Sequence, residues 1–172
     1  MSMRKMNWKY CYLLIITALL VSCSQPSVSE EESLFTKENT DVELESVELS
    51  AQEEELFDLI NTHRNSKGLE PVMFIEDIYV FAEEHNEYMI AQGELSHDNF
   101  NTRASQISEQ TAAKLIAENV AKNFQDPNEA LEGWLASNSH KNTIEGDFTH
   151  STLSISYDNE GNPYYTQIFI RK

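Results

Sequence analysis

The C-terminal residues alternate between apolar and polar side chains with the two-residue period of a β-strand. Apolar residues occupy every second position at Leu153, Ile155 and Tyr157, and serine or threonine lies between them. Residues 158–163 have the composition of a turn, and residues 164–170 are again rich in aromatic and β-branched side chains. The pattern predicts a β-hairpin that buries one face and exposes the other.

Two amphipathic helices are expected well before this hairpin. Ser50 and Glu53 form a capping box, in which each side chain accepts a hydrogen bond from an otherwise unpaired amide at the start of a helix. Apolar residues then recur at helical spacing, which predicts a helix over residues 51–66. The same spacing predicts a second helix over residues 76–92, ending at Gly93.

Two shorter helices are expected to follow. Residues 101–113 have the composition of a short helix, capped by Asn101 or Thr102. Asp126 and Pro127 are typical of a helix start, because aspartate pairs with free amides and proline fits the first helical position. We expect this last helix to end near residue 137. Helices combined with a small sheet indicate an α+β fold.

The chain is strongly acidic. Its 172 residues include 12 Lys and Arg against 29 Asp and Glu, which gives a formal net charge of -17. Nucleic-acid binding depends on basic side chains that neutralise phosphates, so we expect no nucleic-acid partner. The same charge repels anionic lipid headgroups, so attachment to a membrane would need another device.

The N-terminus supplies such a device. Basic residues at positions 4, 5 and 9 precede an apolar run at 12–21, which is shorter than the roughly 20 residues that span a bilayer. This predicts an export signal over residues 1–22. Its end, Leu20-Val21-Ser22-Cys23, resembles a bacterial lipobox, in which the cysteine carries the lipid. The alternative is an ordinary signal peptide followed by an incidental cysteine.

The segment after the signal peptide is expected to be a flexible tether. Residues 24–49 carry eight acidic residues against one lysine, and they have few large apolar side chains. Such a segment buries too little surface to offset its chain entropy. We therefore predict a lipidated, disordered acidic tether at 23–49 and a folded domain at 50–172. Cleavage before Cys23 would also remove Cys11, which excludes an internal disulfide.

Five short segments in the second half of the chain could form a polar cleft. Two histidines and a glutamate lie far apart in sequence, each beside small or turn-forming residues. This arrangement is typical of a polar site that is assembled from loops held by a packed scaffold. The segments are Ser96-His97, Glu118-Asn119-Val120-Ala121, residues 134–140, Phe148-Thr149-His150 and Tyr165-Thr166-Gln167-Ile168-Phe169.

In their order and spacing these segments resemble the CAP superfamily, named for cysteine-rich secretory proteins, antigen 5 and pathogenesis-related 1 proteins, and also called SCP-like domains. The resemblance begins at Asn61-Thr62-His63-Arg64, which is similar to the family's N-x-x-R, and covers about residues 50–172. It implies a three-layer α/β/α sandwich with a small mixed or antiparallel sheet. It also implies that His97, Glu118 and His140 line the cleft.

The chain departs from the family at several positions. Ala117 replaces the glycine of the family's G-E-N-[IV]-A, and Ser137 stands where many members have a second cleft glutamate. Asparagine and serine replace the proline and glycine before His140, which changes the stiffness of the loop expected there. Ser137, Ser139 and His150 are secondary cleft candidates. The alternative for His150 is a surface position at a strand end.

Three other conspicuous side chains are assigned to the structure and not to the cleft. His63 and His85 lie on apolar helix faces, where a histidine is usually packed and hydrogen-bonded. Trp134 is expected to anchor the core and not to stack on a ligand.

Two imidazoles and one carboxylate match the ligands of an open zinc site. We therefore expect His97, Glu118 and His140 to bind zinc or another divalent cation. The strongest zinc motif, an H-E-x-x-H helix, is absent, and the excess negative charge favours non-specific cation binding, which indicates a weak, exchangeable site. A carboxylate flanked by apolar residues needs a partner, and a metal or a protonated histidine would serve. The alternative is a structural Glu118 that accepts hydrogen bonds from backbone amides.

These expectations describe a cell-envelope lipoprotein, anchored in the membrane through Cys23 on the extracytoplasmic side, at the outer membrane or the cell surface. Its cleft would bind a divalent cation, or a small or peptide-like ligand. The resemblance adds lipids and sterols, since members of the family are linked to both. The alternative is a metal-assisted hydrolase of envelope peptides or lipids with Glu118 as base. The chain lacks a G-x-S-x-G nucleophile elbow, which favours binding over catalysis.

Overall fold

The computed structural model describes residues 46–172, and the predicted signal peptide, the lipidation site at Cys23 and most of the tether lie outside these residues. No helix in the described range is long and apolar enough to cross a membrane. The elements are α1 (Ala51–Ser66), β1 (Met73–Phe74), a 3-10 turn η1 (Glu76–Ile78), α2 (Tyr79–Gln92), α3 (Phe100–Thr111), β2 (Leu115–Lys122), α4 (Pro127–Ala136), α5 (Asn138–Ile144), β3 (His150–Tyr157) and β4 (Pro163–Arg171).

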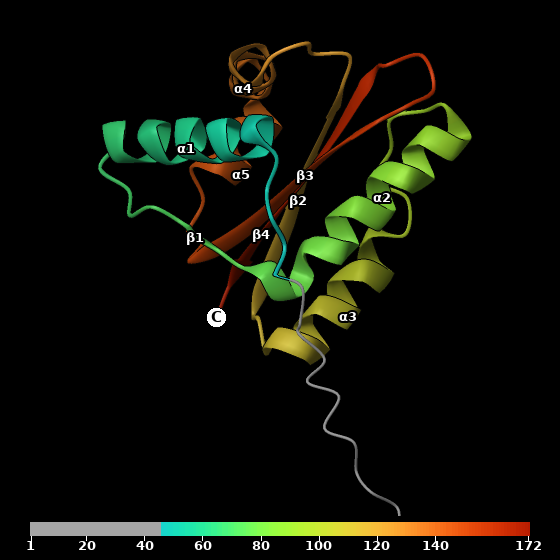
Figure 1. The fold of residues 1–172 in the computed structure, drawn as a ribbon. Coiled ribbons are helices and arrows are strands. Elements are labelled where there is room, and N and C mark those ends of the chain that lie inside the picture. The colour runs from blue at the N-terminus through green and yellow to red at the C-terminus, as the bar shows by residue number, and fades with distance from the viewer. Residues whose placement is uncertain (1–45) are drawn as a thin grey trace, which may run out of the picture. The chain divides into compact units, whose positions relative to one another are not determined.

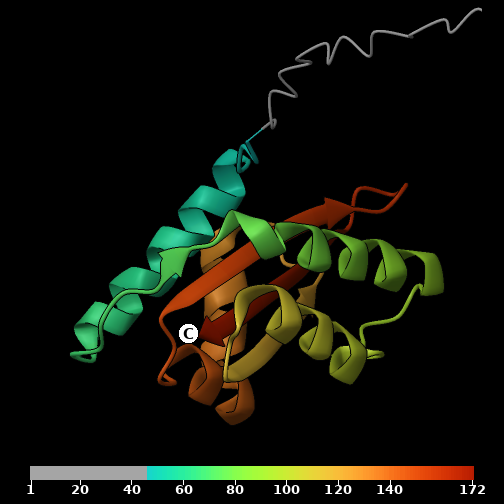
Figure 2. The same ribbon diagram turned by 90° about the horizontal axis from the view of Figure 1, so that it is seen from below.

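The four strands form one mixed sheet that helices cover on both faces. The strand order is β1-β3-β4-β2, with β1 parallel to β3 and the other neighbours antiparallel. Helices α2 and α3 lie on one face, and α1, α4 and α5 lie on the other (Figure 1, Figure 2). The expected α+β fold with three layers, a small mixed sheet and a C-terminal hairpin is confirmed.

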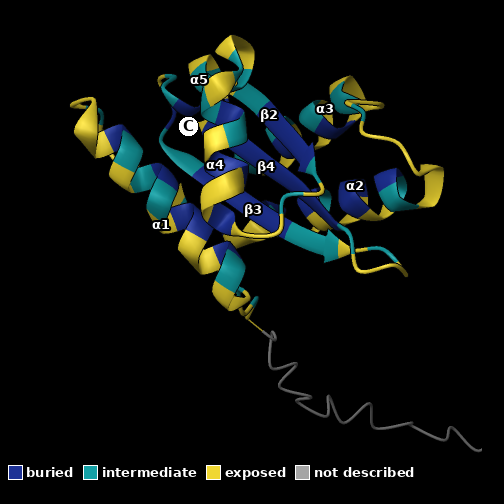
Figure 3. Ribbon diagram, turned by 90° about the horizontal axis from the view of Figure 1, so that it is seen from above, coloured by how far each residue is buried: buried dark blue, intermediate teal, exposed yellow. Residues whose placement is uncertain are grey.

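Strands β3 and β4 form the predicted hairpin, in which Tyr157 pairs with Pro163 across the turn. The expectation of an exposed face is wrong, because Thr152 and Ser154 are buried. This face of β3 packs under α2, where Asn86 Nδ2 donates a hydrogen bond to the Ser154 carbonyl at 2.9 Å. Short hydroxyl side chains suit the position because they leave room for the helix. Figure 3 shows the strands as the most buried part of the fold.

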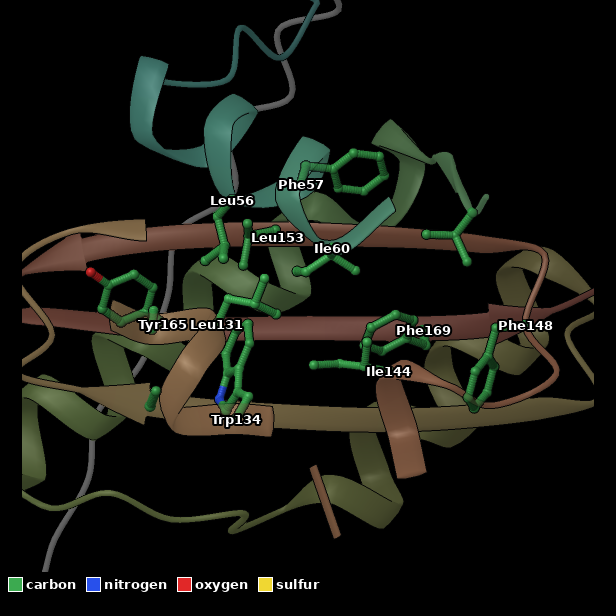
Figure 4. Close-up of a cluster of buried hydrophobic side chains, with 13 residues drawn as sticks. Leu56, Phe57, Ile60, Leu131, Trp134, Ile144, Phe148, Leu153, Tyr165 and Phe169 are labelled. Atoms are coloured by element: carbon green, nitrogen blue, oxygen red, sulfur yellow. The ribbon is translucent and has the colours of Figure 1, made fainter. Parts of the chain in front are cut away.

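The main core lies between the sheet and helices α1 and α4. Trp134 is 1% exposed, as expected of a core anchor, and its ring packs edge-on against Tyr165 with the centroids 6.4 Å apart. The indole N–H donates to the Val120 carbonyl at 3.1 Å, so Trp134 also attaches α4 to β2. Figure 4 shows the surrounding cluster, which includes Leu56, Phe57, Ile60, Leu131, Ile144, Phe148, Leu153 and Phe169.

The predicted capping box is present at the start of α1, and Glu53 does more than cap the helix. The Ser50 amide donates to Glu53 Oε2 at 2.7 Å, and the Glu53 amide donates to Ser50 Oγ at 3.3 Å. Glu53 is also buried, and its Oε1 accepts from the Tyr79 hydroxyl at 2.9 Å and the Ile155 amide at 2.8 Å. One carboxylate thus joins α1 to α2 and β3.

Two predicted helix starts differ from the structure. Residues 76–78 form the 3-10 turn η1, so α2 begins at Tyr79, and the start of α3 also differs. Helix α3 begins at Phe100, and its N-cap is Asn99, not Asn101 or Thr102. Asn99 has a φ of 60°, in the left-handed region that asparagine adopts more readily than most residues. The chain therefore turns sharply one residue before the helix, and the two polar residues that follow lie inside its first turn.

Arg64, the arginine of the N-x-x-R segment, is buried and bonds main-chain carbonyls. Its Nε donates to Glu70 O at 3.0 Å, and its Nη1 donates to Ile144 O at 2.6 Å and Gly146 O at 2.9 Å. Burial lowers the pKa of Arg64, and the negative charge of Asp147 opposes this shift. Arg64 therefore holds the end of α5 and the turn after it against α1.

We expect Tyr79 and Tyr165 to ionise late in an alkaline titration. Burial raises the pKa of both hydroxyls from 10.0 to about 12. Since the folded state holds these protons more tightly, their contribution to stability is complete below pH 10.0 and is lost as the pH rises toward 12. Ultraviolet absorbance of tyrosinate measures the titration, and Tyr79→Phe and Tyr165→Phe should each remove part of the late phase. A single phase near the ordinary value in the unsubstituted protein would contradict the prediction.

Candidate functional site

Glu118 lies on β2 and its side chain is only 1% exposed. Its Oε2 accepts two hydrogen bonds from the guanidinium of Arg103, at 2.8 Å from Nε and 2.6 Å from Nη2. Its Oε1 lies 2.9 Å from Nδ1 of His97. Both carboxylate oxygens are therefore engaged, and the partners are two side chains, not the backbone amides considered as an alternative.

Arg103 is the member of this group that the sequence analysis missed. It is a buried residue of α3, and its Nη1 also donates to the Asp98 carbonyl at 3.2 Å. Two features of the sequence could have indicated it. A carboxylate between apolar residues needs a cation, and Arg103 lies one helical turn before Ile107, the other buried residue of α3.

His97 lies in the loop between α2 and α3, and 50% of its side chain is exposed. The loop is tied down on both sides, since the Ser96 carbonyl lies 2.9 Å from His85 Nε2 and the His97 carbonyl accepts from the Phe100 amide at 3.1 Å. Glu118 fixes one ring nitrogen of His97. The other nitrogen, Nε2, is left for a further partner.

His85 is buried beneath this loop, in agreement with its structural assignment. Its Nε2 lies 3.6 Å from Glu118 Oε1, in addition to its contact with the Ser96 carbonyl. Burial lowers the pKa of His85, and the carboxylate of Glu118 opposes the shift. The ring stacks on Tyr88 with the centroids 6.0 Å apart. His85 therefore supports the loop that carries His97.

His140 lies on α5, although the sequence led us to expect a loop there. The extended backbone of Ser137 ends α4 and starts α5, so the chain turns at one residue and becomes helical again. The His140 carbonyl accepts from Asn119 Nδ2 at 3.1 Å, which attaches α5 to β2. Burial lowers the pKa of His140, and the nearby charge of His97 lowers it further. The structure thus brings the two histidines into the same region.

The secondary candidates fall into two groups. Ser137 and Ser139 hydrogen-bond each other through their hydroxyls at 3.0 Å, at the start of the helix that carries His140. His150 begins β3, and its Nδ1 lies 2.8 Å from the Thr149 hydroxyl. Because β4 separates β3 from β2, His150 lies away from the strand that carries Glu118.

A hollow of about 300 Å³ opens beside Glu118. It combines an apolar lining with one imidazole, and its residues are His97, Phe100, Ile116, Ala117 and Glu118. Within residues 46–172, no three His, Cys, Asp or Glu side chains form a group that could hold a metal ion. His97 is the imidazole among the residues that line this hollow, and His140 is not one of them.

Comparison with known proteins gives a consistent family and fold. The model of the CAP family, described as the cysteine-rich secretory protein family, matches residues 57–169. The uncharacterized protein YkwD of Bacillus subtilis is 29% identical over 159 residues, which is 88% of this chain and 59% of YkwD. The chain therefore corresponds to about three fifths of that relative.

Two solved structures have a similar fold. An outer surface protein from Borrelia burgdorferi superposes with a TM-score of 0.65 at 17% identity, over 74% of this chain and 97% of that one. An extracellular protein containing a SCP domain from Bacillus anthracis superposes with a TM-score of 0.59 at 26% identity, over 74% of this chain and 45% of that one. The first likeness concerns the fold alone, and the second concerns one part of a longer protein.

Proposed function

Because the chain belongs to the cysteine-rich secretory protein (CAP) family, we propose that it is an extracytoplasmic binding domain whose cleft takes a small or peptide-like ligand and an exchangeable divalent cation. The observation that carries the proposal is the contact between Glu118 Oε1 and His97 Nδ1 at 2.9 Å. An ionised carboxylate only accepts hydrogen bonds, so the proton of His97 is assigned to Nδ1. Its Nε2 is then an unprotonated ligand atom in a half-exposed side chain.

Glu118 acts in this proposal by orienting His97. A carboxylate behind a histidine fixes the tautomer and the ring, and it makes the free nitrogen a better ligand. His140 supplies the second imidazole, and its lowered pKa keeps the ring neutral at pH values where an ordinary histidine would begin to take up a proton. A zinc ion held there would act as a Lewis acid toward a bound carbonyl or phosphoryl group. A zinc ion held by only two histidines and water molecules would bind weakly and exchange readily.

The cellular setting is part of the proposal. The predicted export signal and lipobox support a lipoprotein attached to the cell envelope through Cys23. The name of one similar structure, an extracellular protein containing a SCP domain, supports an extracytoplasmic place. Lipids and sterols remain candidate ligands, because members of the family are linked to both. The hydrolase alternative has less support, because Arg103 and His97 already engage both oxygens of the carboxylate that would act as base.

We expect zinc titration by calorimetry to give a saturable heat that His97→Ala and His140→Ala each abolish. His150→Ala is the matched control, since it removes an imidazole outside the cleft and should leave the heat unchanged. The affinity for zinc should fall as the pH drops, because protons compete with the metal for the imidazole nitrogens that would bind it. If His140→Ala titrated like the unsubstituted protein, the cation site would not be where we place it.

A further inference from the structure

The outer edge of β2 offers unpaired main-chain groups beside the cleft. Strand β2 pairs with β4 on one side, and no strand among residues 46–172 pairs with its other side. The Asn123 amide donates to the Pro163 carbonyl, and hydrogen-bonded pairs recur at every second residue of an antiparallel ladder. Odd-numbered residues of β2 therefore bond β4. The N–H and C=O groups of Ile116, Glu118 and Val120 point to the free edge.

The chain itself already uses one end of this edge. The Val120 carbonyl accepts from Trp134 Nε1 at 3.1 Å, and Val120 is 3% exposed, so this end is closed. The other end is open. Leu115 is 46% exposed, and Glu118 is 8% exposed as a residue although its side chain is only 1% exposed. Glu118 is thus nearly buried, and the small part of it that is exposed belongs to its main chain.

The open stretch borders the hollow described above. Ile116, Ala117 and Phe100 give the hollow its apolar lining, and His97 stands beside them. Side chains of a strand point alternately to its two faces. A strand laid along β2 would therefore place one side chain in the hollow while its main chain bonds Ile116 and Glu118.

We propose that an extended peptide adds to the β2 edge at Ile116 and Glu118 and inserts an apolar side chain into the hollow beside Phe100. This inference rests on the proposed function and names its ligand class. The N–H and C=O groups on the free edge of β2 repeat at every second residue, which matches the spacing in another extended peptide. Such a peptide could form several main-chain hydrogen bonds with the edge at once. A lipid or sterol would fill the hollow and leave these groups unpaired.

The charges at this end of the sheet favour a peptide that also carries a carboxylate. Lys114 is exposed immediately before the open stretch. Arg171 lies opposite Leu115 in the register, but it is already ion-paired with Asp147, so the attraction for a carboxylate comes mainly from Lys114. Glu118 is the carboxylate of β2, and Arg103 neutralises it. The net charge of the chain is -17, but charges elsewhere on the surface are screened within about 8 Å at physiological salt, so the nearby Lys114 has more influence on a bound carboxylate than the distant acidic residues.

The test uses capped pentapeptides of the form Thr-X-Thr-Asp-Thr, with X as Val, Leu, Phe or Lys, and fluorescence anisotropy in the presence of EDTA. We expect the apolar peptides to bind and the Lys peptide to bind at least tenfold more weakly. Peptides methylated on the backbone nitrogens should lose binding, because their side chains are intact but their donors are gone. No saturable binding by any of the peptides at millimolar concentration would overturn the proposal.

The matched pair of variants is Ile116→Pro and Ile116→Ala. Both variants lose the isoleucine side chain. Proline additionally lacks the N–H, which points away from β4, and an edge strand tolerates proline there, whereas alanine keeps the N–H. Ile116→Pro should bind the Phe peptide about tenfold more weakly than Ile116→Ala, the effect of one main-chain hydrogen bond. Equal affinities would overturn the edge geometry. Circular dichroism checks that both variants fold.

Hydrogen exchange locates the bound peptide and separates this inference from the cation site. The Phe peptide should slow exchange at the amides of Ile116 and Glu118, and His140→Ala should keep this protection. Protection elsewhere, or protection produced by phosphatidylglycerol vesicles and not by the peptide, would overturn the inference in favour of another ligand. If zinc does not bind but the peptide still protects these amides, the proposed cation site is refuted and the peptide site is retained.

Discussion

Arg103→Met should destabilise the domain by about 3–5 kcal/mol at neutral pH, the usual cost of leaving one partner of a buried ion pair alone. The guanidinium gives Glu118 Oε2 two short hydrogen bonds, at 2.8 and 2.6 Å, and the side chain of Glu118 is 1% exposed. Methionine has a similar length and no charge, so the variant buries a carboxylate with no cation. Urea unfolding, followed by the fluorescence of Trp134, measures the loss.

The double variant Arg103→Met with Glu118→Gln is the matched control. It removes both charges and keeps two side chains of similar volume, so it should be more stable than Arg103→Met alone by at least about 1 kcal/mol. If the double variant were as unstable as the single one, the loss would come from the packing of α3 and not from the ion pair. His97→Ala should cost less than Arg103→Met, because half of the His97 side chain is in solvent.

Arg64→Met is the second large effect that we expect, with a loss of about 3–4 kcal/mol in the free energy of unfolding. The variant leaves the carbonyls of Glu70 and Ile144 without the donor that Arg64 supplies, while the Gly146 carbonyl keeps its hydrogen bond from the Phe148 amide. A hydrogen bond from a charged donor contributes about 1.5–3 kcal/mol, and an unpaired buried acceptor adds its own cost. Thermal unfolding by circular dichroism measures the change.

Two further variants define what Arg64 contributes. Arg64→Lys should recover only part of the loss, since an ammonium on a flexible chain does not reproduce the planar set of donors. Arg171→Met removes another arginine, one that is exposed and ion-paired with Asp147, and should cost less than about 1 kcal/mol. If Arg64→Met were as mild as Arg171→Met, the buried carbonyl contacts would not be what holds α5 in place.

Local signals in the sequence predicted much of the fold. The capping box at Ser50 and Glu53 and the proline at position 127 mark helix starts that the structure has at the same places, because these contacts lie within one helical turn. Gly93 likewise ends α2 in the left-handed conformation expected of a helix stop. The order of the family motifs added the three-layer arrangement.

The errors concern features that depend on distant parts of the chain. The alternation around Thr152 and Ser154 is that of a half-exposed strand, yet α2 covers this face, and no pattern within the strand shows where a helix some 70 residues earlier will pack. The site has the same dependence. The motif contains Glu118, but its partner Arg103 lies on a polar helix outside the motif, and only the folded chain brings the two together.

Glu53 has a mechanical consequence. The Ser50 amide before α1, the Tyr79 hydroxyl of α2 and the Ile155 amide of β3 all donate to this carboxylate, which lies in the first turn of α1. Force applied through the preceding residues would meet these bonds before it reaches the centre of the sheet. A domain held by its N-terminal side would thus resist being peeled open from that end, and the cleft on the far edge of the sheet would keep its shape under tension.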